Sequence, residues 1–156
     1  MKLLAVIVGG VALFSEVASC QGFFASCKSN WYVERGTSIM YAECSNEDGD
    51  FVESRLDLNK CIANDNGALS GRERGNFYNA CRSCLPDTLL PVAGEDVGSG
   101  GLVPSLPPQT SILTCACSQK DATEVLNSDV DLDAFIGSDA DGILNCFGQS
   151  GEEVDE

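Results

Sequence analysis

The chain reads SRLDLNKCIANDNGAL at residues 54–69 and SDVDLDAFIGSDADGIL at residues 128–144. Both stretches have the order Ser-x-[Leu/Val]-Asp-Leu, then an isoleucine, then a closing Gly-x-Leu. Self-similarity of this kind marks an internal repeat. The same Phe-x-x-x-Cys pattern stands upstream of each stretch. We therefore predict two tandem repeats, which cover residues 22–69 and 76–144.

Short strands and turns dominate the local pattern. Residues 39–44 and 51–56 carry aromatic and β-branched residues on either side of a turn rich in Asn, Asp and Gly, which predicts a β-hairpin. Residues 111–117 predict another strand, on which alternation places both cysteines on one face. Residues 57–62 and their copy predict a single helical turn after a polar cap. We expect a mainly β fold.

The composition excludes several classes of function. The chain has 9 Lys and Arg against 24 Asp and Glu, a net charge of −15, so its surface repels phosphate backbones and anionic lipid. We expect no nucleic acid partner and no membrane insertion. Histidine is absent, which removes the most common general base and the usual partner of a nucleophile. We expect no enzymatic activity and no cofactor.

Residues 1–20 have the layout of a secretory signal peptide. One basic residue, Lys2, precedes a short apolar run and then small residues. The spacing of the small residues allows cleavage after Ser19 or after Cys20. The chain has nine cysteines, and removing Cys20 leaves an even set of eight, so we favour Gln21 as the first mature residue. This layout predicts a secreted, extracellular protein.

Two further segments differ in composition from the repeats. Residues 85–110 are rich in Pro, Gly and Ser, which predicts an exposed loop inserted between two strands. Residues 148–156 are acidic, which predicts a disordered tail after a folded domain of residues 21–147.

Acidic loops at residues 129–133 and 139–142 could supply oxygen ligands to calcium. An EF-hand with Gly142 at its sixth position would need acidic residues where Gly137 and Gly148 stand, so this motif fails. Solvated turns explain the acidic residues better, and we expect no metal site.

Eight elements in order resemble the cyanovirin-N homology family: Phe-x-x-x-Cys, Cys, Ser-x-Leu-Asp-Leu-Asn-x-x-Ile and Asn-Gly-x-Leu, then Asn-Phe-x-x-x-Cys-Arg, Cys, Ser-x-Val-Asp-Leu-x-x-x-Ile and Asp-Gly-x-Leu. The resemblance covers nearly the whole mature chain. It implies two pseudo-symmetric β-rich halves with exchanged strands and short helical turns. It also implies a glycan ligand, with oligomannose as the first candidate. We expect a monomer, and a swapped dimer with its hinge at residues 72–75 remains open.

Eight cysteines are expected to form four disulfides that staple this fold. The expected pairs are Cys27 with Cys44, Cys81 with Cys117, Cys84 with Cys115, and Cys61 with Cys146. The resemblance implies the first two pairs. The cysteines of the third pair flank the second pair on the two arms of one expected hairpin, so they can be close enough to bridge, and the fourth pair is what remains. Spacing alone leaves other pairings of these last four cysteines open.

The resemblance further implies a shallow polar cleft in each half that binds sugar through hydrogen bonds. For the second-half cleft the candidate residues are Asn66, Asn76, Asn79, Ser118, Gln119 and Lys120, while Ala63 and Ala80 stand where polar groups are expected. For the first-half cleft, which keeps fewer matching residues, they are Ser26, Ser45, Glu47, Asp139 and Asp141. In the alternative interpretation, residues such as Asn76 and Asp141 only satisfy turns and caps.

Two functions remain open at this point. The first is a lectin-like carbohydrate-binding protein, for which Trp31 is an aromatic candidate for altered specificity, although aromatic residues in so small a fold more often pack in the core. The second is a secreted protein-interaction module that kept the fold, lost sugar binding and uses the inserted loop. The alanines at the expected polar positions favour the second.

Overall fold

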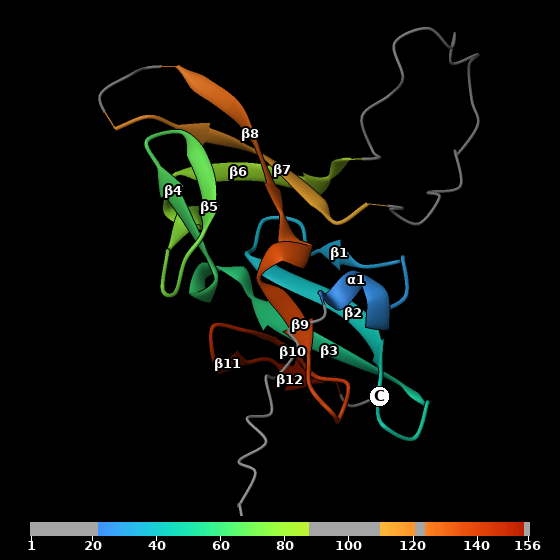
Figure 1. The fold of residues 1–156 in the computed structure, drawn as a ribbon. Helices are drawn as coiled ribbons and strands as arrows, with labels where there is room; N and C mark the ends of the chain where they lie inside the picture. Colours follow the sequence, from blue (N-terminus) through green and yellow to red (C-terminus); the bar gives the residue numbers. More distant parts are fainter. Residues whose placement is uncertain (1–21, 88–109, 121–123, 155–156) are drawn as a thin grey trace, which may run out of the picture.

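The computed structural model describes residues 22–87, 110–120 and 124–154 as a mainly β fold (Figure 1). One short α-helix and several 3-10 turns accompany the strands. The elements of the first repeat are α1 (Phe23–Ser26), β1 (Tyr32–Val33), β2 (Ile39–Ser45), β3 (Phe51–Asp57), η1 (Leu58–Lys60), β4 (Ile62–Asp65) and β5 (Ala68–Gly71). Those that follow are η2 (Phe77–Asn79), β6 (Cys81–Pro86), β7 (Ile112–Ser118), β8 (Val125–Asp131), η4 (Leu132–Ala134), β9 (Ile136–Ser138), β10 (Leu144–Cys146), β11 (Gln149–Ser150) and β12 (Glu152–Glu153).

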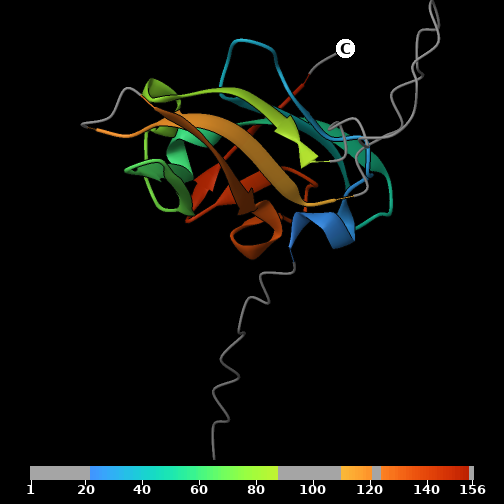
Figure 2. The same cartoon turned by 90° about the horizontal axis from the view of Figure 1, so that it is seen from above.

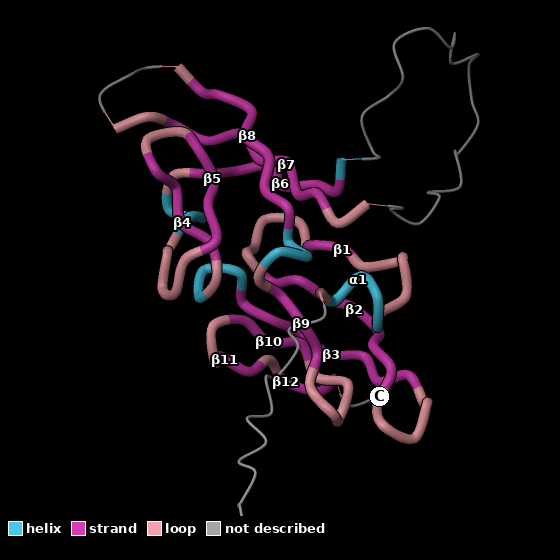
Figure 3. Tube along the Cα trace, in the orientation of Figure 1, coloured by secondary structure: helices cyan, strands magenta, loops and turns pink. Residues whose placement is uncertain are grey.

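The strands form two halves, and each half contains elements of both repeats (Figures 1 and 3). One half has the sheet β1-β2-β3-β12 and the small sheet β11-β10-β9, while the other has the sheet β6-β7-β8 and the hairpin β4-β5. The β4-β5 hairpin of the first repeat packs against β8 of the second. In return, β10 packs against β3 and β9 against α1, which also lies beside η4 (Figure 2). The exchanged, pseudo-symmetric arrangement expected from the resemblance is therefore present.

The serine that opens each repeat motif holds the exchanged hairpin. The hydroxyl of Ser54, which is fully buried, accepts a hydrogen bond from the backbone N–H of Leu144 at 3.0 Å. The hydroxyl of Ser128 accepts one from the N–H of Leu69 at 2.8 Å. Each serine thus joins its own strand to the hairpin of the other repeat.

The aspartate three residues later caps the 3-10 turn that follows. Asp57 accepts the N–H of Asn59 at 3.0 Å, and Asp131 accepts the N–H of Asp133 at 3.1 Å. Carboxylates at this position satisfy N–H groups that a helical turn leaves unpaired. The acidic residues of 129–133 are therefore accounted for in part by local structure, as expected.

Four disulfides join the halves and their strands. They pair Cys27 with Cys44, Cys61 with Cys146, Cys81 with Cys117, and Cys84 with Cys115, which are the four pairs expected above. Around them lies a core of large side chains with no solvent exposure, which includes Phe23, Phe77, Met40, Leu58, Ile62, Leu113, Leu132, Ile136 and Leu144.

Trp31 belongs to this core, so its interpretation as a sugar-contacting residue is wrong. Its side chain is fully buried and packs edge-on against Phe23, with ring centroids 5.7 Å apart. Its indole N–H donates a hydrogen bond to the carbonyl of Thr110 at 2.9 Å. A buried indole needs such a partner, and this bond ties residue 110 to the first half.

The predicted disordered tail is also wrong for residues 149–154. β11 pairs with β10, and β12 pairs with β3, where Glu152 lies opposite Arg55. An Arg55 nitrogen donates to the Glu152 carboxylate at 2.7 Å, and the N–H of Val154 donates to the carbonyl of Glu53 at 2.9 Å. Partners far away in the sequence order this segment in spite of its acidic composition.

The predicted signal peptide lies outside the described residues, and so does most of the predicted inserted loop. The strands that flank this loop, β6 and β7, pair with each other. Among the described residues, no helix is long and apolar enough to cross a membrane. Within the same ranges, no group of three or more Cys, Asp or Glu side chains is placed to hold a metal ion.

Candidate functional site

A cleft of about 550 Å³ opens in the second half, between the turn of the β4-β5 hairpin and the segment that follows β7. Its lining is polar except for one alanine, and consists of Asn64, Asn66, Ala80, Ser118, Gln119 and Lys120. The Ser118 hydroxyl donates to the carbonyl of Ala80 at 3.1 Å, so it retains acceptor capacity toward the cleft.

Asn66 reaches the cleft because the hairpin turn is tight. Asp65 pairs with Ala68, which leaves Asn66 and Gly67 as a two-residue turn with φ values of 56° and 96°. Asn-Gly is favoured in such turns because both residues tolerate positive φ. The Asn66 side-chain oxygen accepts the N–H of Lys120 at 3.0 Å, and this bond joins the two walls of the cleft.

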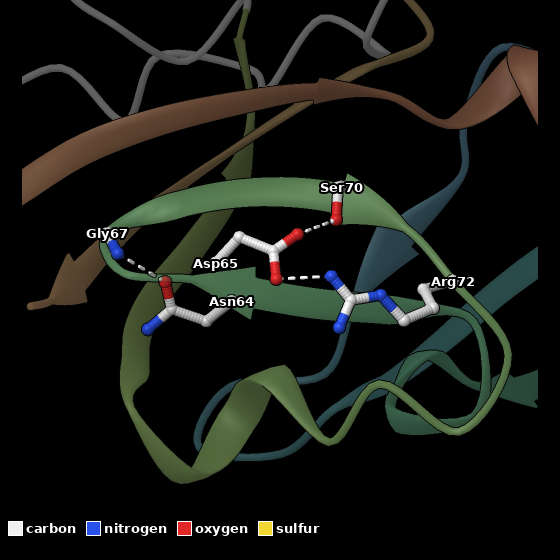
Figure 4. Close-up of polar contacts among 5 residues, drawn as sticks. All are labelled: Asn64, Asp65, Gly67, Ser70 and Arg72. Atoms are coloured by element: carbon white, nitrogen blue, oxygen red, sulfur yellow. Dashed lines mark hydrogen bonds and ion pairs between the residues drawn. The ribbon is translucent and has the colours of Figure 1, made fainter. Parts of the chain in front are cut away.

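Asn64 is a fixed part of the lining. Its side-chain oxygen accepts the N–H of Gly67 at 2.7 Å, as Figure 4 shows, and its amide nitrogen donates to the carbonyl of Ser118 at 3.0 Å. Both ends of this side chain are therefore used to hold the hairpin against β7. Its role is to position the cleft.

Asp65 strengthens the same hairpin from the outer side (Figure 4). Its carboxylate accepts a hydrogen bond from the Ser70 hydroxyl at 2.6 Å and another from the Arg72 guanidinium. The Ser70 hydrogen bond, followed by the Arg72 interactions, lowers the pKa of Asp65. These contacts hold the carboxylate in its ionised form.

Free hydrogen-bonding groups remain in the cleft. Among the described residues, neither the Asn66 amide nitrogen nor the Gln119 side-chain amide makes a hydrogen bond to another side chain or to backbone. Together with the Lys120 ammonium and the Ser118 lone pairs, they provide both donors and acceptors. This set suits an uncharged ligand with many hydroxyl groups better than an ion.

Four of the six residues predicted for this cleft line it: Asn66, Ser118, Gln119 and Lys120. Asn76 and Asn79 are exposed but lie outside the lining. Asn76 has a φ of 57° at the start of η2 and forms an isolated β-bridge with Ala63. Ala63 is buried and also lies outside the lining of the cleft. Asn76 thus takes a left-handed backbone conformation at this turn, its side chain makes no capping hydrogen bond there, and its part in sugar binding stays a prediction.

The sequence interpretation did not include Asn64, because it matched Ala63 to the cleft-facing position of this strand. Alternation along β4 would not have found it, because Ile62 and Ala63 are both buried and only then does the strand become exposed. Ala63 is apolar and suits the core, and Asn64 is then directed to the cleft.

The first half has a pseudo-symmetric counterpart of this arrangement. Ser45, which corresponds to Ser118, donates its hydroxyl to the carbonyl of Ser26 at 3.1 Å. The Ser26 and Ser138 hydroxyls are hydrogen-bonded at 2.8 Å. The structure therefore brings Ser26 and Ser45 together beside the β9-β10 turn.

The acidic candidates of the first half gather at that turn. The N–H of Glu47 donates to the carbonyl of Ala140 at 2.9 Å. Asp139 accepts the N–H groups of Asp141 and Ile143 at 3.1 and 2.9 Å, which is the turn role expected for this acidic loop. Glu47 and Asp141 stand where the second half has Lys120 and Asn66, so the two sites differ in charge.

Fold and site together define a disulfide-stapled β protein with two related halves and a polar cleft in one of them. The family model of the CVNH domain matches residues 23–89. Over these residues the chain is similar to the cyanovirin-N homology family, and the fold of the described residues is cyanovirin-N-like.

Individual relatives agree with this assignment. A cyanovirin-N homolog of Tuber borchii is 44% identical over 46 residues, which are 30% of this chain and 45% of that protein, so the match spans less than half of the relative. The solved structure of a CVNH protein of Gibberella zeae is 28% identical, with a TM-score of 0.58 over 81% of this chain and 97% of that one. A microvirin structure in complex with mannobiose is 25% identical, with a TM-score of 0.54 over 80% and 97% of the two chains.

Proposed function

We propose that this protein is a lectin that binds a glycan in the second-half cleft through hydrogen bonds, without chemical change of the glycan. The observation that carries the proposal is the cleft itself, which offers to a neutral ligand the amide groups of Asn66 and Gln119 that make no bond among the described residues, the Lys120 ammonium, and the acceptor capacity of the Ser118 hydroxyl. A mannose-containing glycan is the first candidate, because microvirin is solved with mannobiose.

We also propose that the protein is secreted after removal of residues 1–20. The apolar N-terminal segment supports this, and so does the use of all eight other cysteines in disulfides, which persist in oxidising compartments. Mass spectrometry of the protein collected from the medium of a eukaryotic host tests the proposal. A mature chain that begins at Gln21 supports it, while an intact Met1 in material retained by the cells contradicts it.

Calorimetric titration with an oligomannose glycan tests the lectin proposal. The informative variant is Asn66→Gly, because glycine keeps the positive φ of the turn and removes the amide. The matched control is Asn76→Gly, since Asn76 has nearly the same φ but lies outside the cleft. We expect saturable binding that is weaker by about tenfold or more in Asn66→Gly, which loses a hydrogen bond to the glycan and the bond that joins the cleft walls, and unchanged binding in Asn76→Gly.

Ala80 favours a second candidate, a protein-interaction module without sugar binding, because it brings a methyl group to the lining where a polar group was expected. Absence of binding to any neutral glycan at millimolar concentration would reject the lectin proposal and favour this alternative.

A further inference from the structure

The turn of the exchanged hairpin meets the neighbouring strand differently in the two halves. In the first half, the N–H of Glu47 donates to the backbone carbonyl of Ala140, which lies in that turn, at 2.9 Å. In the second half, the corresponding N–H of Lys120 donates to the side-chain oxygen of Asn66 at 3.0 Å. Backbone therefore meets backbone in the first half, while a side chain bridges the two walls in the second.

The glycine of each turn shows which atoms lie beside it. A Cβ atom built at Gly142 would lie 2.8 Å from the carbonyl oxygen of Cys44 and 3.4 Å from the backbone nitrogen of Asn46. A Cβ atom built at Gly67 would instead lie 2.9 Å from Cγ and 3.6 Å from Nε2 of Gln119. The first-half turn thus lies directly on the strand backbone, whereas the second-half turn lies on the side chain of Gln119.

The residue that corresponds to Gln119 is held elsewhere in the first half. That residue is Asn46, because each of the two is the second residue after a matching disulfide cysteine. The Asn46 side-chain oxygen accepts the N–H groups of Asp48 and Asp50 at 3.1 and 2.9 Å, so this side chain stays within its own turn. Gln119 has one more methylene group, and no hydrogen bond within the described part of the chain holds its amide. Its stem is therefore free to lie against the opposite turn.

The two turns also differ in length. Ser138 pairs with Leu144, which leaves residues 139–143 in the first-half turn, whereas Asp65 pairs with Ala68, which leaves only residues 66 and 67. The longer turn reaches the strand backbone directly. The shorter turn meets side chains instead, so its contact with Gln119 fixes its distance from the strand.

We propose that Gln119 is a positioning residue, whose stem supports the turn at residues 66 and 67 and thereby sets the width of the second-half cleft. This inference rests on the proposed function and adds a role that is separate from any hydrogen bond between the Gln119 amide and the glycan. A shorter side chain would remove the contacts beside Gly67. The wall that carries Asn66 would then have to be ordered when the glycan binds, which lowers the affinity.

Two variants separate these roles in calorimetric titration with an oligomannose glycan. Gln119→Met keeps an unbranched stem of similar length and removes the amide, while Gln119→Ala removes both. We expect binding about three- to tenfold weaker in Gln119→Met, as loss of one hydrogen bond predicts. We expect a further loss of about tenfold in Gln119→Ala, because the packing of two methylene groups is lost as well. Equal losses in the two variants would overturn the inference.

Amide hydrogen exchange in the absence of glycan tests the support of the turn independently of binding. We expect the N–H of Lys120, which Asn66 accepts, to exchange severalfold faster in Gln119→Ala and at the wild-type rate in Gln119→Met. The N–H of Glu47 is the matched control, because it makes the corresponding bond in the first half, and its unchanged exchange shows that both variants fold.

Unchanged exchange at Lys120 in Gln119→Ala would contradict the positioning role, whatever the affinities. Failure of the wild type to bind any saccharide, with faster exchange at Lys120 in Gln119→Ala, would instead remove the proposed function and leave the support of the turn intact.

Discussion

At the scale of single residues, one serine in each repeat does much to join the two repeats. Ser54 and Ser128 accept the backbone N–H of a leucine from the other repeat's hairpin, at 3.0 and 2.8 Å. A backbone N–H that is buried without an acceptor costs more than the bond itself contributes, because its desolvation is not offset. The serine of the repeat motif is therefore a structural residue.

We predict that Ser54→Ala lowers the free energy of unfolding by about 1–3 kcal/mol, because it leaves the N–H of Leu144 buried and unpaired. Ser128→Ala should cost less, since Ser128 is only partly buried. Urea unfolding with the disulfides intact measures both, with the exposed Ser150→Ala as the control. A Ser54→Ala variant as stable as Ser150→Ala would contradict the structural role.

The role of a residue could be predicted from the sequence where its side chain interacts with the backbone of nearby residues. It could not be predicted where the role depends on burial by distant segments. The Asn66-Gly67 turn could be predicted, because positive φ is a local demand. The core packing of aromatic residues was a general expectation, but the particular contacts that bury Trp31 could not be predicted, because its contact with Phe23 and its bond to residue 110 join separate segments. For the same reason, the sequence indicated polar residues near the cleft but could not separate Asn66 from Asn76.

At the scale of elements, the β4-β5 hairpin carries the site and depends on Asp65. The pKa of Asp65 is lowered chiefly by the Ser70 hydroxyl and then by Arg72. Because the folded-state pKa lies below the unfolded one, the stabilisation is complete above the usual value of 3.8 and is lost as the pH falls through the folded-state pKa.

We predict that the Asp65 carboxylate titrates below 3.8 and that Ser70→Ala moves its midpoint upward more than Arg72→Ala does. Carboxyl ¹³C shifts followed against pH measure this directly. High salt should weaken the Arg72 effect, since that pair is exposed, and leave the hydroxyl bond unchanged. An Asp65 midpoint at or above the usual value in the wild type would contradict the described hairpin.

The β-hairpins and the 3-10 turns could be predicted because alternation and caps are local signals. β12 could not be predicted, because it has two residues, both glutamates, and gains its order from pairing with β3 almost a hundred positions earlier. Pairing of this kind overrides the composition of the segment.

At the scale of the whole molecule, the disulfides differ in what they constrain. The Cys61–Cys146 bridge spans 85 residues and ties the end of η1 to β10. The Cys84–Cys115 bridge lies inside the loop already closed by Cys81–Cys117. In the chain-entropy account, a bridge that closes a long loop restricts the unfolded chain more than one nested inside another.

We therefore predict that replacing Cys61 and Cys146 by alanine lowers the free energy of unfolding by about 3–4 kcal/mol. Replacing Cys84 and Cys115 should cost about 1 kcal/mol, because little loop entropy is returned. Denaturant unfolding of the two double variants compares them. Equal losses in the two variants would contradict the nested-loop argument.

The central claim is that the second-half cleft binds a glycan, and amide NMR on the oxidised protein during titration with oligomannose tests it most directly. We predict saturable shifts that cluster at residues 64–67 and 118–120, and that weaken in Asn66→Gly but persist in Asn76→Gly. Shifts confined to other surfaces, or no shifts at millimolar glycan, would contradict the claim.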